Sequence, residues 1–354
     1  MRTLPLIALL LTGCQTEVGV LGAPETGWTA VFDSQYGDFP AELALANDGL
    51  PVIAMTSFND HNNLVHTLEI EPTDGEMTFF DAHYTQGVAL ALLADDHVAT
   101  AVTSPAPEPG LLVREFSLGG IEQNTFMDYD MEPVALDGAA GGFMSMLTWD
   151  ANTNRWLLKG WEAGTSLWTI ELTAGEREPV DVVVDGEYVF VVMDGLGTRP
   201  TVQSFDRHGE QRWVSGELCG QDIASDGAGG LYAAGATPDD GAVQLCRVDN
   251  KGGLVWHQRN VIDWEQWVGV SDIAVRDGMI VLIGSAYEED VPAVQWTWAY
   301  DESGQALWAD RWAGSDGGFA MGREVVIGAN GAVFTAGIEW QQDYAMVMRR
   351  LEGQ

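Results

Sequence analysis

One eight-residue pattern recurs in the second half of this 354-residue chain and limits the folds that the chain can adopt. The pattern is Asp-x-x-Gly-x-x-x-Trp, and its copies are Asp206, Gly209 and Trp213, then Asp249, Gly252 and Trp256, then Asp301, Gly304 and Trp308. We expect a tight turn in each copy, because aspartate can accept a hydrogen bond from its own backbone two residues on and glycine adopts a positive φ cheaply. The tryptophan should then open the following strand.

A second pattern lies between these turns and consists of two short apolar runs separated by Asp-Gly or Asn-Gly. It is clear at residues 181–192, 222–235, 272–284 and 324–337, and weaker at 43–54, 88–103 and 134–147. Such a pattern is typical of a β-hairpin. In the weaker copies at 88–103 and 134–147, the expected turns are Asp95-Asp96 and Asp137-Gly138. A third strand follows each of the clear hairpins in the middle of the chain and leads into the Asp-x-x-Gly turn.

The aromatic residue expected to open each outer strand recurs at a regular interval. Its positions are Trp28, Phe79, Phe126, Trp168, Trp213, Trp256 and Trp308, which are 42 to 52 residues apart. Four strands in each unit of 40–50 residues is the period of a β-propeller, in which repeats of WD40-like size close into a ring. The sequence therefore predicts an all-β protein with a single propeller over residues 28–354, with seven four-stranded blades favoured over six or eight.

Both ends of the repeat region predict how the ring closes. The first unit begins with an extra outer strand at 28–32, and the chain ends in a third-strand pattern at 345–351 with no fourth strand after it. We expect the N-terminal strand to pair into the last blade, which also hides exposed sheet edges. The tryptophans expected to fill the wedges between blades are Trp28, Trp168, Trp213, Trp256 and Trp308.

The first fourteen residues have the composition of an export signal. Arg2 is followed by an apolar run from Leu4 to Leu11 and then by Thr12-Gly13-Cys14. That run is too short to span a bilayer, which needs roughly 20 residues. The ending resembles the lipobox of bacterial lipoproteins, which implies a signal peptide at 1–13, a lipid on Cys14 and a tether at 14–27. Gln15 is not the aspartate that retains many lipoproteins at the inner membrane, so the resemblance favours the outer membrane of the cell envelope, facing the periplasm or the surface.

The charge of the chain restricts its partners. It has 53 acidic and 16 basic residues, a formal net charge of −37. Such a field opposes binding to nucleic acid and to anionic lipid headgroups, so we expect membrane contact through the lipid anchor alone and a monomer in solution. Cys219 and Cys246 remain once Cys14 is lipidated. Because an exported chain meets an oxidising compartment, this pair is a disulfide candidate, although a free pair is equally compatible with the sequence.

The Asp-x-x-Gly-x-x-x-Trp unit resembles the repeat of the pyrroloquinoline-quinone-like (PQQ-like) propellers over residues 28–351. That superfamily includes quinoprotein dehydrogenases and the propeller lipoprotein of the outer-membrane β-barrel assembly machinery, whose lipobox-plus-propeller layout is similar. The resemblance implies a propeller fold. A quinoprotein enzyme would also need adjacent cysteines against its cofactor, and the sequence has no Cys-Cys pair, so no cofactor is expected.

The sequence contains no recognisable catalytic or metal-binding motif. It lacks a Gly-x-Ser-x-Gly elbow, a lysine-containing phosphate loop and paired histidines at zinc spacing. Ca²⁺ at Asp128 and Asp130 or at Asp239 and Asp240 remains an alternative to solvated turns. We therefore expect a non-catalytic scaffold that binds protein or glycan ligands through the loops of one propeller face. The alternative is a glycan-active hydrolase or lyase that uses carboxylates at the channel mouth, which strongly perturbed pKa values there would favour.

Overall fold

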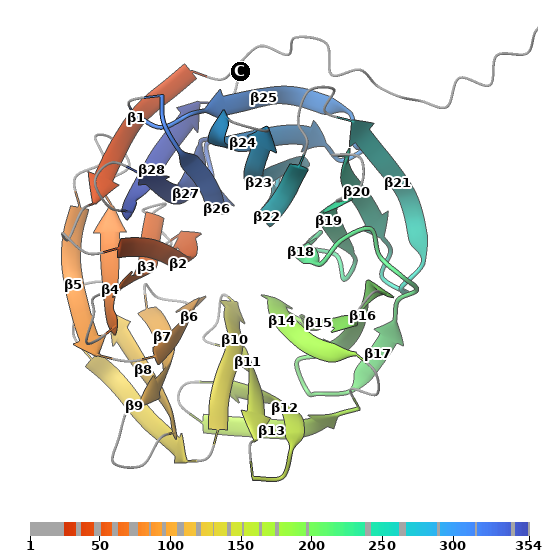
Figure 1. Ribbon diagram of the computed structural model, residues 1–354. Helices are drawn as coiled ribbons and strands as arrows, with labels where there is room; N and C mark the ends of the chain where they lie inside the picture. Colours follow the sequence, from red (N-terminus) through yellow and green to blue (C-terminus); the bar gives the residue numbers. More distant parts are fainter. Residues whose placement is uncertain are drawn as a thin grey trace, which may run out of the picture.

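Seven sheets of four antiparallel strands stand around a central axis in this computed structural model, as the sequence predicts (Figure 1). The structure describes residues 25–32, 37–45, 51–58, 63–70, 77–84, 86–93, 97–104, 110–117, 122–129, 131–139, 143–150, 152–162, 165–173, 177–195, 198–237, 242–261, 267–288, 291–315, 317–340 and 344–352. Within these residues no helix is long and apolar enough to cross a membrane.

The first three blades cover the first half of the chain, and the strands of each are given from the centre outward. Blade 1 contains β2 (Gly37–Leu45), β3 (Pro51–Phe58), β4 (Asn63–Ile70) and β5 (Met77–Tyr84). Blade 2 contains β6 (Gln86–Leu93), β7 (His97–Ser104), β8 (Gly110–Ser117) and β9 (Glu122–Tyr129). Blade 3 contains β10 (Met131–Ala139), β11 (Phe143–Asp150), β12 (Arg155–Glu162) and β13 (Thr165–Leu172).

The remaining blades follow in the same order. Blade 4 contains β14 (Glu178–Asp185), β15 (Tyr188–Gly195), β16 (Thr198–Asp206) and β17 (Gln211–Val214). Blade 5 contains β18 (Asp222–Ser225), β19 (Leu231–Thr237), β20 (Ala242–Val248) and β21 (Leu254–Val261). Blade 6 contains β22 (Trp267–Arg276), β23 (Met279–Glu288), β24 (Val291–Asp301) and β25 (Ala306–Trp312). Blade 7 contains β26 (Ala320–Ile327), β27 (Val333–Trp340), β28 (Tyr344–Glu352) and β1 (Glu25–Phe32).

Blade 7 closes the ring with strands from both ends of the described chain. β1 pairs antiparallel with β28 in a register that joins Phe32 to Met346 and Trp28 to Arg350. The predicted closure is therefore confirmed, and Figure 1 shows β1 on the outside of the last blade. Because β1 takes the fourth place in this sheet, β28 has hydrogen-bonded neighbours on both sides and presents no open edge.

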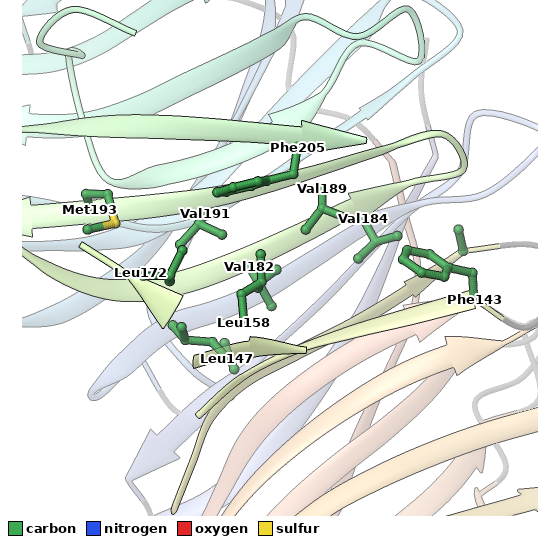
Figure 2. Close-up of a cluster of buried hydrophobic side chains, with 12 residues drawn as sticks. Phe143, Leu147, Leu158, Leu172, Val182, Val184, Val189, Val191, Met193 and Phe205 are labelled. Carbon is green, nitrogen blue, oxygen red and sulfur yellow. The ribbon is translucent and has the colours of Figure 1, made fainter. Parts of the chain in front are cut away.

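The core lies in the wedges between blades. Figure 2 shows the wedge between blades 3 and 4, where Phe143, Leu147 and Leu158 face Val184 and Val189. Each such side chain contributes roughly 1.5–3 kcal/mol when it leaves water. The middle strands are apolar along most of their length because neighbouring blades cover both of their faces. The second strand of blade 7, β27, for example, buries its first seven residues.

Two local predictions are wrong. Asp137 and Gly138 do not form a turn but lie inside β10, where Asp137 Oδ1 accepts the Gly138 N–H at 2.7 Å. This local hydrogen bond occurs in extended backbone because the inner edge of β10 has no strand beside it to use that N–H. The outer-strand tryptophans are also displaced, since Trp213, Trp256 and Trp308 stand third in their strands rather than first. Pairing with the third strand resumes soon after the turn, at Gln211 in blade 4.

Candidate functional site

The three clear Asp-x-x-Gly turns have one geometry. The aspartate Oδ1 accepts two backbone N–H groups, from His208 and Glu210 in the first turn at 2.9 and 3.0 Å. The same pair of bonds forms at Asp249 and at Asp301. The glycines Gly209, Gly252 and Gly304 have φ of 82°, 80° and 82°. Hydrogen bonds from these turns lower the pKa of Asp249 and of Asp301, so both carboxylates are occupied in holding the turns.

The tryptophans singled out from the sequence lie in the wedges between blades. Trp168 packs between blades 3 and 4, Trp213 between 4 and 5, Trp256 between 5 and 6, Trp308 between 6 and 7, and Trp28 between 7 and 1. Their rings therefore serve the core and leave the propeller faces to other residues.

A disulfide joins Cys219 to Cys246, whose Cα atoms are 6.1 Å apart. Cys219 lies in the connection from blade 4 to blade 5, and Cys246 lies in β20, so the bond fastens that connection to the third strand of blade 5. Cys14 lies outside the described residues. The pairs proposed for Ca²⁺ also include residues outside them, so Ca²⁺ binding stays a prediction. Among the described residues, no group of three or more His, Cys, Asp or Glu side chains could hold a metal ion.

A cavity of about 730 Å³ occupies the centre of the ring. Residues of the inner strands β2, β10, β14, β18, β22 and β26 line it, and a smaller cavity of about 300 Å³ continues it along β2, β10, β22 and β26. We call the larger one the central cavity. Six of the seven blades therefore contribute side chains to the central cavity.

Carboxylates recur at one level of the central cavity. Asp181, Asp222, Asp272 and Glu324 line it, each on the inner strand of a different blade. Their partners on the second strands are Val192, Ala234, Ile283 and Ala336, which occupy matching places in their ladders. In blades 4, 6 and 7 this carboxylate is the first paired residue after a β-bulge. A bulge can turn the following side chain to a new direction, and bulges are common next to functional sites.

Asp137 and Asp272 also connect neighbouring blades. Asp137 Oδ2 accepts the Val184 N–H of blade 4 at 2.6 Å. Asp272 Oδ2 accepts the Val325 N–H of blade 7 at 2.7 Å, while its Oδ1 accepts the Ile273 N–H at 2.6 Å. These N–H groups are on the inner edges of the propeller, where no further strand pairs with them. The two carboxylates therefore satisfy edge donors and hold inner strands of adjacent blades together.

The ionisation of these groups is strongly perturbed. Burial raises the pKa of Asp137 and of Asp181 to about 7, and that of Asp272 to about 6. Burial also raises the pKa of Asp222 well above its usual value, and the charges of Asp272 and Asp181 raise it further. We call these four residues the carboxylate cluster. Carboxylic acids that keep a proton near neutral pH can act as general acids or donate hydrogen bonds to a ligand.

Sequence reasoning missed the carboxylate cluster, although a signal was present. Three of its members begin the repeated hairpins with an acidic residue followed by a branched apolar one: Asp181-Val182, Asp222-Ile223 and Asp272-Ile273. Glu324-Val325 repeats the pattern in blade 7. The acidic position recurs in the same place in these four copies, which a scattered surface charge would not do.

Several known structures are similar to this chain at low sequence identity. The propeller domain of Myceliophteria thermophila Cps50 (Swd1) is 10% identical, with a TM-score of 0.58, and the match covers 92% of this chain and 99% of that one. Prolyl oligopeptidase B from Galerina marginata is 10% identical with a TM-score of 0.50, over 85% of this chain and 46% of that one. A eukaryotic initiation factor is 13% identical with a TM-score of 0.44, over 77% and 65%.

The chain thus spans less than two thirds of the initiation factor and of the oligopeptidase. Searches with protein-family models and among curated protein sequences gave no match. The similarity to the Swd1 domain covers nearly the whole of both chains, and at this identity it shows the fold alone, a β-propeller.

Proposed function

We propose that this chain is an exported lipoprotein, anchored through Cys14 to the outer membrane, whose PQQ-like propeller binds a protein or glycan ligand at one face without catalysis. The central cavity carries this proposal, because strands from six blades line it and it places carboxylates at one level. Cavities of roughly 300–1,000 Å³ with a few convergent polar groups are typical ligand sites.

The hydrogen bonds of the carboxylate cluster support a binding role over catalysis. Asp137 and Asp272 each use both oxygens to accept backbone N–H groups, so their lone pairs are committed to the inner strands. A proton donor in catalysis has to reach the reacting atom of its substrate. Among the described residues, the Asp181 carboxylate accepts one hydrogen bond, from the Val182 N–H at 2.8 Å, so its second oxygen can meet a ligand in the cavity.

A pull-down tests the binding role. The full-length chain, solubilised in detergent, is incubated with outer-membrane extract beside an Asp181→Asn/Asp222→Asn double variant. An Asp277→Asn variant serves as control, since Asp277 is 86% exposed at the β22–β23 turn and does not line the cavity. Stoichiometric recovery of one ligand by the wild type and the control, with loss in the double variant, supports binding in the cavity. Equal recovery by all three forms would place the ligand elsewhere.

A second experiment tests the lipid anchor. Cells that express the chain are fed an alkyne-tagged fatty acid, and the wild type is compared with a Cys14→Ser variant. We expect label and outer-membrane fractionation in the wild type and neither in the variant. Labelling that survives the substitution would contradict anchoring through Cys14.

The raised pKa values favour one competing function, a glycan-active hydrolase or lyase. Asp181 has a pKa of about 7 and senses the charges of Asp137 and Asp272 nearby, an arrangement suited to a general acid beside ionised partners. Such an enzyme would release new reducing ends from a panel of polysaccharides with a pH optimum near neutrality, and Asp181→Asn would abolish the activity. Turnover of this kind would replace the scaffold proposal.

A further inference from the structure

Trp340 differs from every other tryptophan whose side chain the structure describes. It ends β27 with 50% of its surface exposed, whereas the others are buried or partly buried. It also belongs to none of the described clusters between blades. An indole left half in water forgoes much of the stabilisation that burial would give, so its exposure needs a reason other than packing.

Two other aromatic rings hold Trp340 in place. Tyr344, its partner across the β27–β28 pair, packs edge-on against it with ring centroids 4.8 Å apart and ring planes at 77°. Phe319 packs against Tyr344 at 6.0 Å, and the Phe319 carbonyl accepts the Trp340 backbone N–H at 3.1 Å. We call Phe319, Trp340 and Tyr344 the aromatic platform. A ligand that binds there meets rings already in position and pays little for ordering them.

A buried acid fixes the segment that carries Phe319. Glu339, 1% exposed, precedes Trp340 in β27, and its two oxygens accept the backbone N–H and the hydroxyl of Ser315 at 2.8 and 3.2 Å. Ser315 lies in the connection from β25 to β26, which also contains Phe319. These hydrogen bonds tie Ser315 to β27 at the residue before Trp340.

Arg323 lies on β26, the inner strand of the blade whose second strand ends at Trp340. Arg323 is exposed, and within the described residues no hydrogen bond or ion pair engages its guanidinium, which carries five N–H donors. Arg323 lies at the β-bulge of β26, between Gly322 and Glu324, whose partners in β27 are Gly337 and Ala336, a few residues before Trp340. Burial raises the pKa of Tyr287, and the positive charge of Arg323 lowers it. Arg323 directly precedes Glu324, which lines the cavity.

We propose that the aromatic platform and Arg323 form a binding subsite for a neutral oligosaccharide, one sugar ring of which stacks its C–H face on Trp340. The hydroxyl groups of the neighbouring sugar then accept hydrogen bonds from Arg323. This subsite rests on the proposed function and names the ligand as a glycan. The bound oligosaccharide would then extend from the rim of blade 7 toward the central cavity.

The surroundings of Trp340 favour a sugar over a protein. Among the side chains that the structure describes, the other exposed large apolar ones lie on inner or outer strands: Val31, Val134, Leu167, Val180, Val214, Leu254, Val255 and Leu307. A protein interface needs a contiguous apolar centre in a patch of several hundred Å². A single strongly exposed indole, held by Tyr344, matches the apolar C–H face of one sugar ring instead. The net charge of −37 disfavours polyanionic glycans.

An array of immobilised neutral and carboxylated oligosaccharides tests the subsite. The full-length chain is applied in detergent beside variants Trp340→Ala, Trp340→Phe and Arg323→Ala. Leu254→Ala is the control, because Leu254 is 60% exposed but lies on the outer strand β21. We expect binding to neutral probes to fall at least tenfold in Trp340→Ala and at least threefold in Arg323→Ala. Trp340→Phe should stay within threefold, and Leu254→Ala should be unchanged.

Fluorine NMR gives a readout that does not depend on immobilisation. In protein labelled with 5-fluorotryptophan, the resonance missing from Trp340→Phe identifies Trp340, and the best array probe should shift that resonance first. No binding to any oligosaccharide, or binding that Trp340→Ala leaves unchanged, would overturn the subsite. If Trp340→Ala leaves glycan binding unchanged, the glycan binds elsewhere on the propeller, and the proposed function is still supported. Preference for carboxylated probes would overturn the neutral ligand, and turnover of a probe would overturn the non-catalytic scaffold.

Discussion

The indole N–H of Trp168 donates a hydrogen bond of 2.8 Å to the carbonyl oxygen of Arg207, 39 residues later in the chain. Trp168 is in the outer strand of blade 3, and Arg207 is in the Asp-x-x-Gly turn of blade 4. The same turn brings Gly209 against the indole ring, and Gly252 of blade 5 lies against Trp213 in the same way. At these two blade boundaries the tryptophan of one blade therefore packs against the turn of the next, whereas Gly304 of the third turn lies against Gln258.

Gly209→Ala should destabilise the protein through this contact. At φ of 82° a side chain is strained, and the new Cβ would stand 3.0 Å from Ile170 Cδ1 and 3.1 Å from Trp168 Cδ2. We expect the free energy of unfolding in urea to fall by about 2–3 kcal/mol, from backbone strain and overpacking together. Gly278→Ala is the matched control, because Gly278 has φ of 80° with nothing within 4 Å of the added Cβ. It should lose about 1–2 kcal/mol from strain alone; equal losses would show that the Trp168 contact is unimportant.

The turns and hairpins could be predicted from the sequence because their interactions are local. The bonds from Asp206 reach residues only two and four positions on, so a short motif contains all the groups involved. Ring closure was also predictable. The repeats begin with an extra outer strand and end with a blade that lacks one, so the two ends can pair. The number of blades followed from the spacing of the aromatic residues.

The carboxylate cluster could not be located in the same way. Its members are about 40 to 50 residues apart, as Asp181, Asp222 and Asp272 show, and they meet only when the ring closes. Asp137 stands two residues beyond the matching position in its blade, so even the repeat does not align it. The exposure of Trp340 depends likewise on its place at the end of a middle strand, which composition cannot distinguish from the wedge tryptophans.

Asp310→Asn should lower the free energy of unfolding far more than the loss of a surface ion pair of the same length does. Arg349 Nη1 is 2.7 Å from Asp310 Oδ2, and the two side chains are 4% and 10% exposed, in β28 and β25 of adjacent blades. Asp310→Asn removes the negative charge of a buried partner of this guanidinium, so we expect the free energy of urea unfolding to fall by about 3 kcal/mol. The control is Glu171→Gln, whose pair with Arg155 is also 2.7 Å long but 55% and 54% exposed. The free energy of unfolding of Glu171→Gln should fall by less than about 1 kcal/mol.

Replacing both bonded cysteines by alanine should lower stability without changing the fold. The Cys219–Cys246 bond spans 27 positions, and closing a loop of that size in the unfolded chain is worth about 3 kcal/mol. Thermal unfolding of the Cys219→Ala/Cys246→Ala variant should therefore begin at a lower temperature than that of the wild type. A reducing agent should lower the wild-type transition to the same value and leave the variant unaffected. A wild type insensitive to reductant would argue that the thiols are free in the protein.

The carboxylate cluster should make stability depend on pH in an unusual direction. The pKa of Asp137 and of Asp181 is about 7 in the folded protein and that of Asp272 about 6, whereas an ordinary aspartate has 3.8. Between pH 4 and pH 7 the folded state therefore holds protons at these sites that the unfolded state has released. Because stability falls with rising pH when the folded state binds more protons, these groups contribute most below pH 4 and lose that contribution by pH 7.

Asp181→Asn isolates one member of the cluster. The amide oxygen can still accept the Val182 N–H, so the variant removes the ionisation and keeps the hydrogen bond. It should match the wild type in urea unfolding at pH 4 and exceed it at pH 8, by on the order of 1 kcal/mol once the solvent that reaches the cavity is allowed for. Asp277→Asn removes the same charge from an exposed turn and should leave the slope between pH 4 and 8 unchanged. If Asp181→Asn is less stable than the wild type at pH 8, the carboxylate is favourable there as an anion, and the cavity holds a compensating charge.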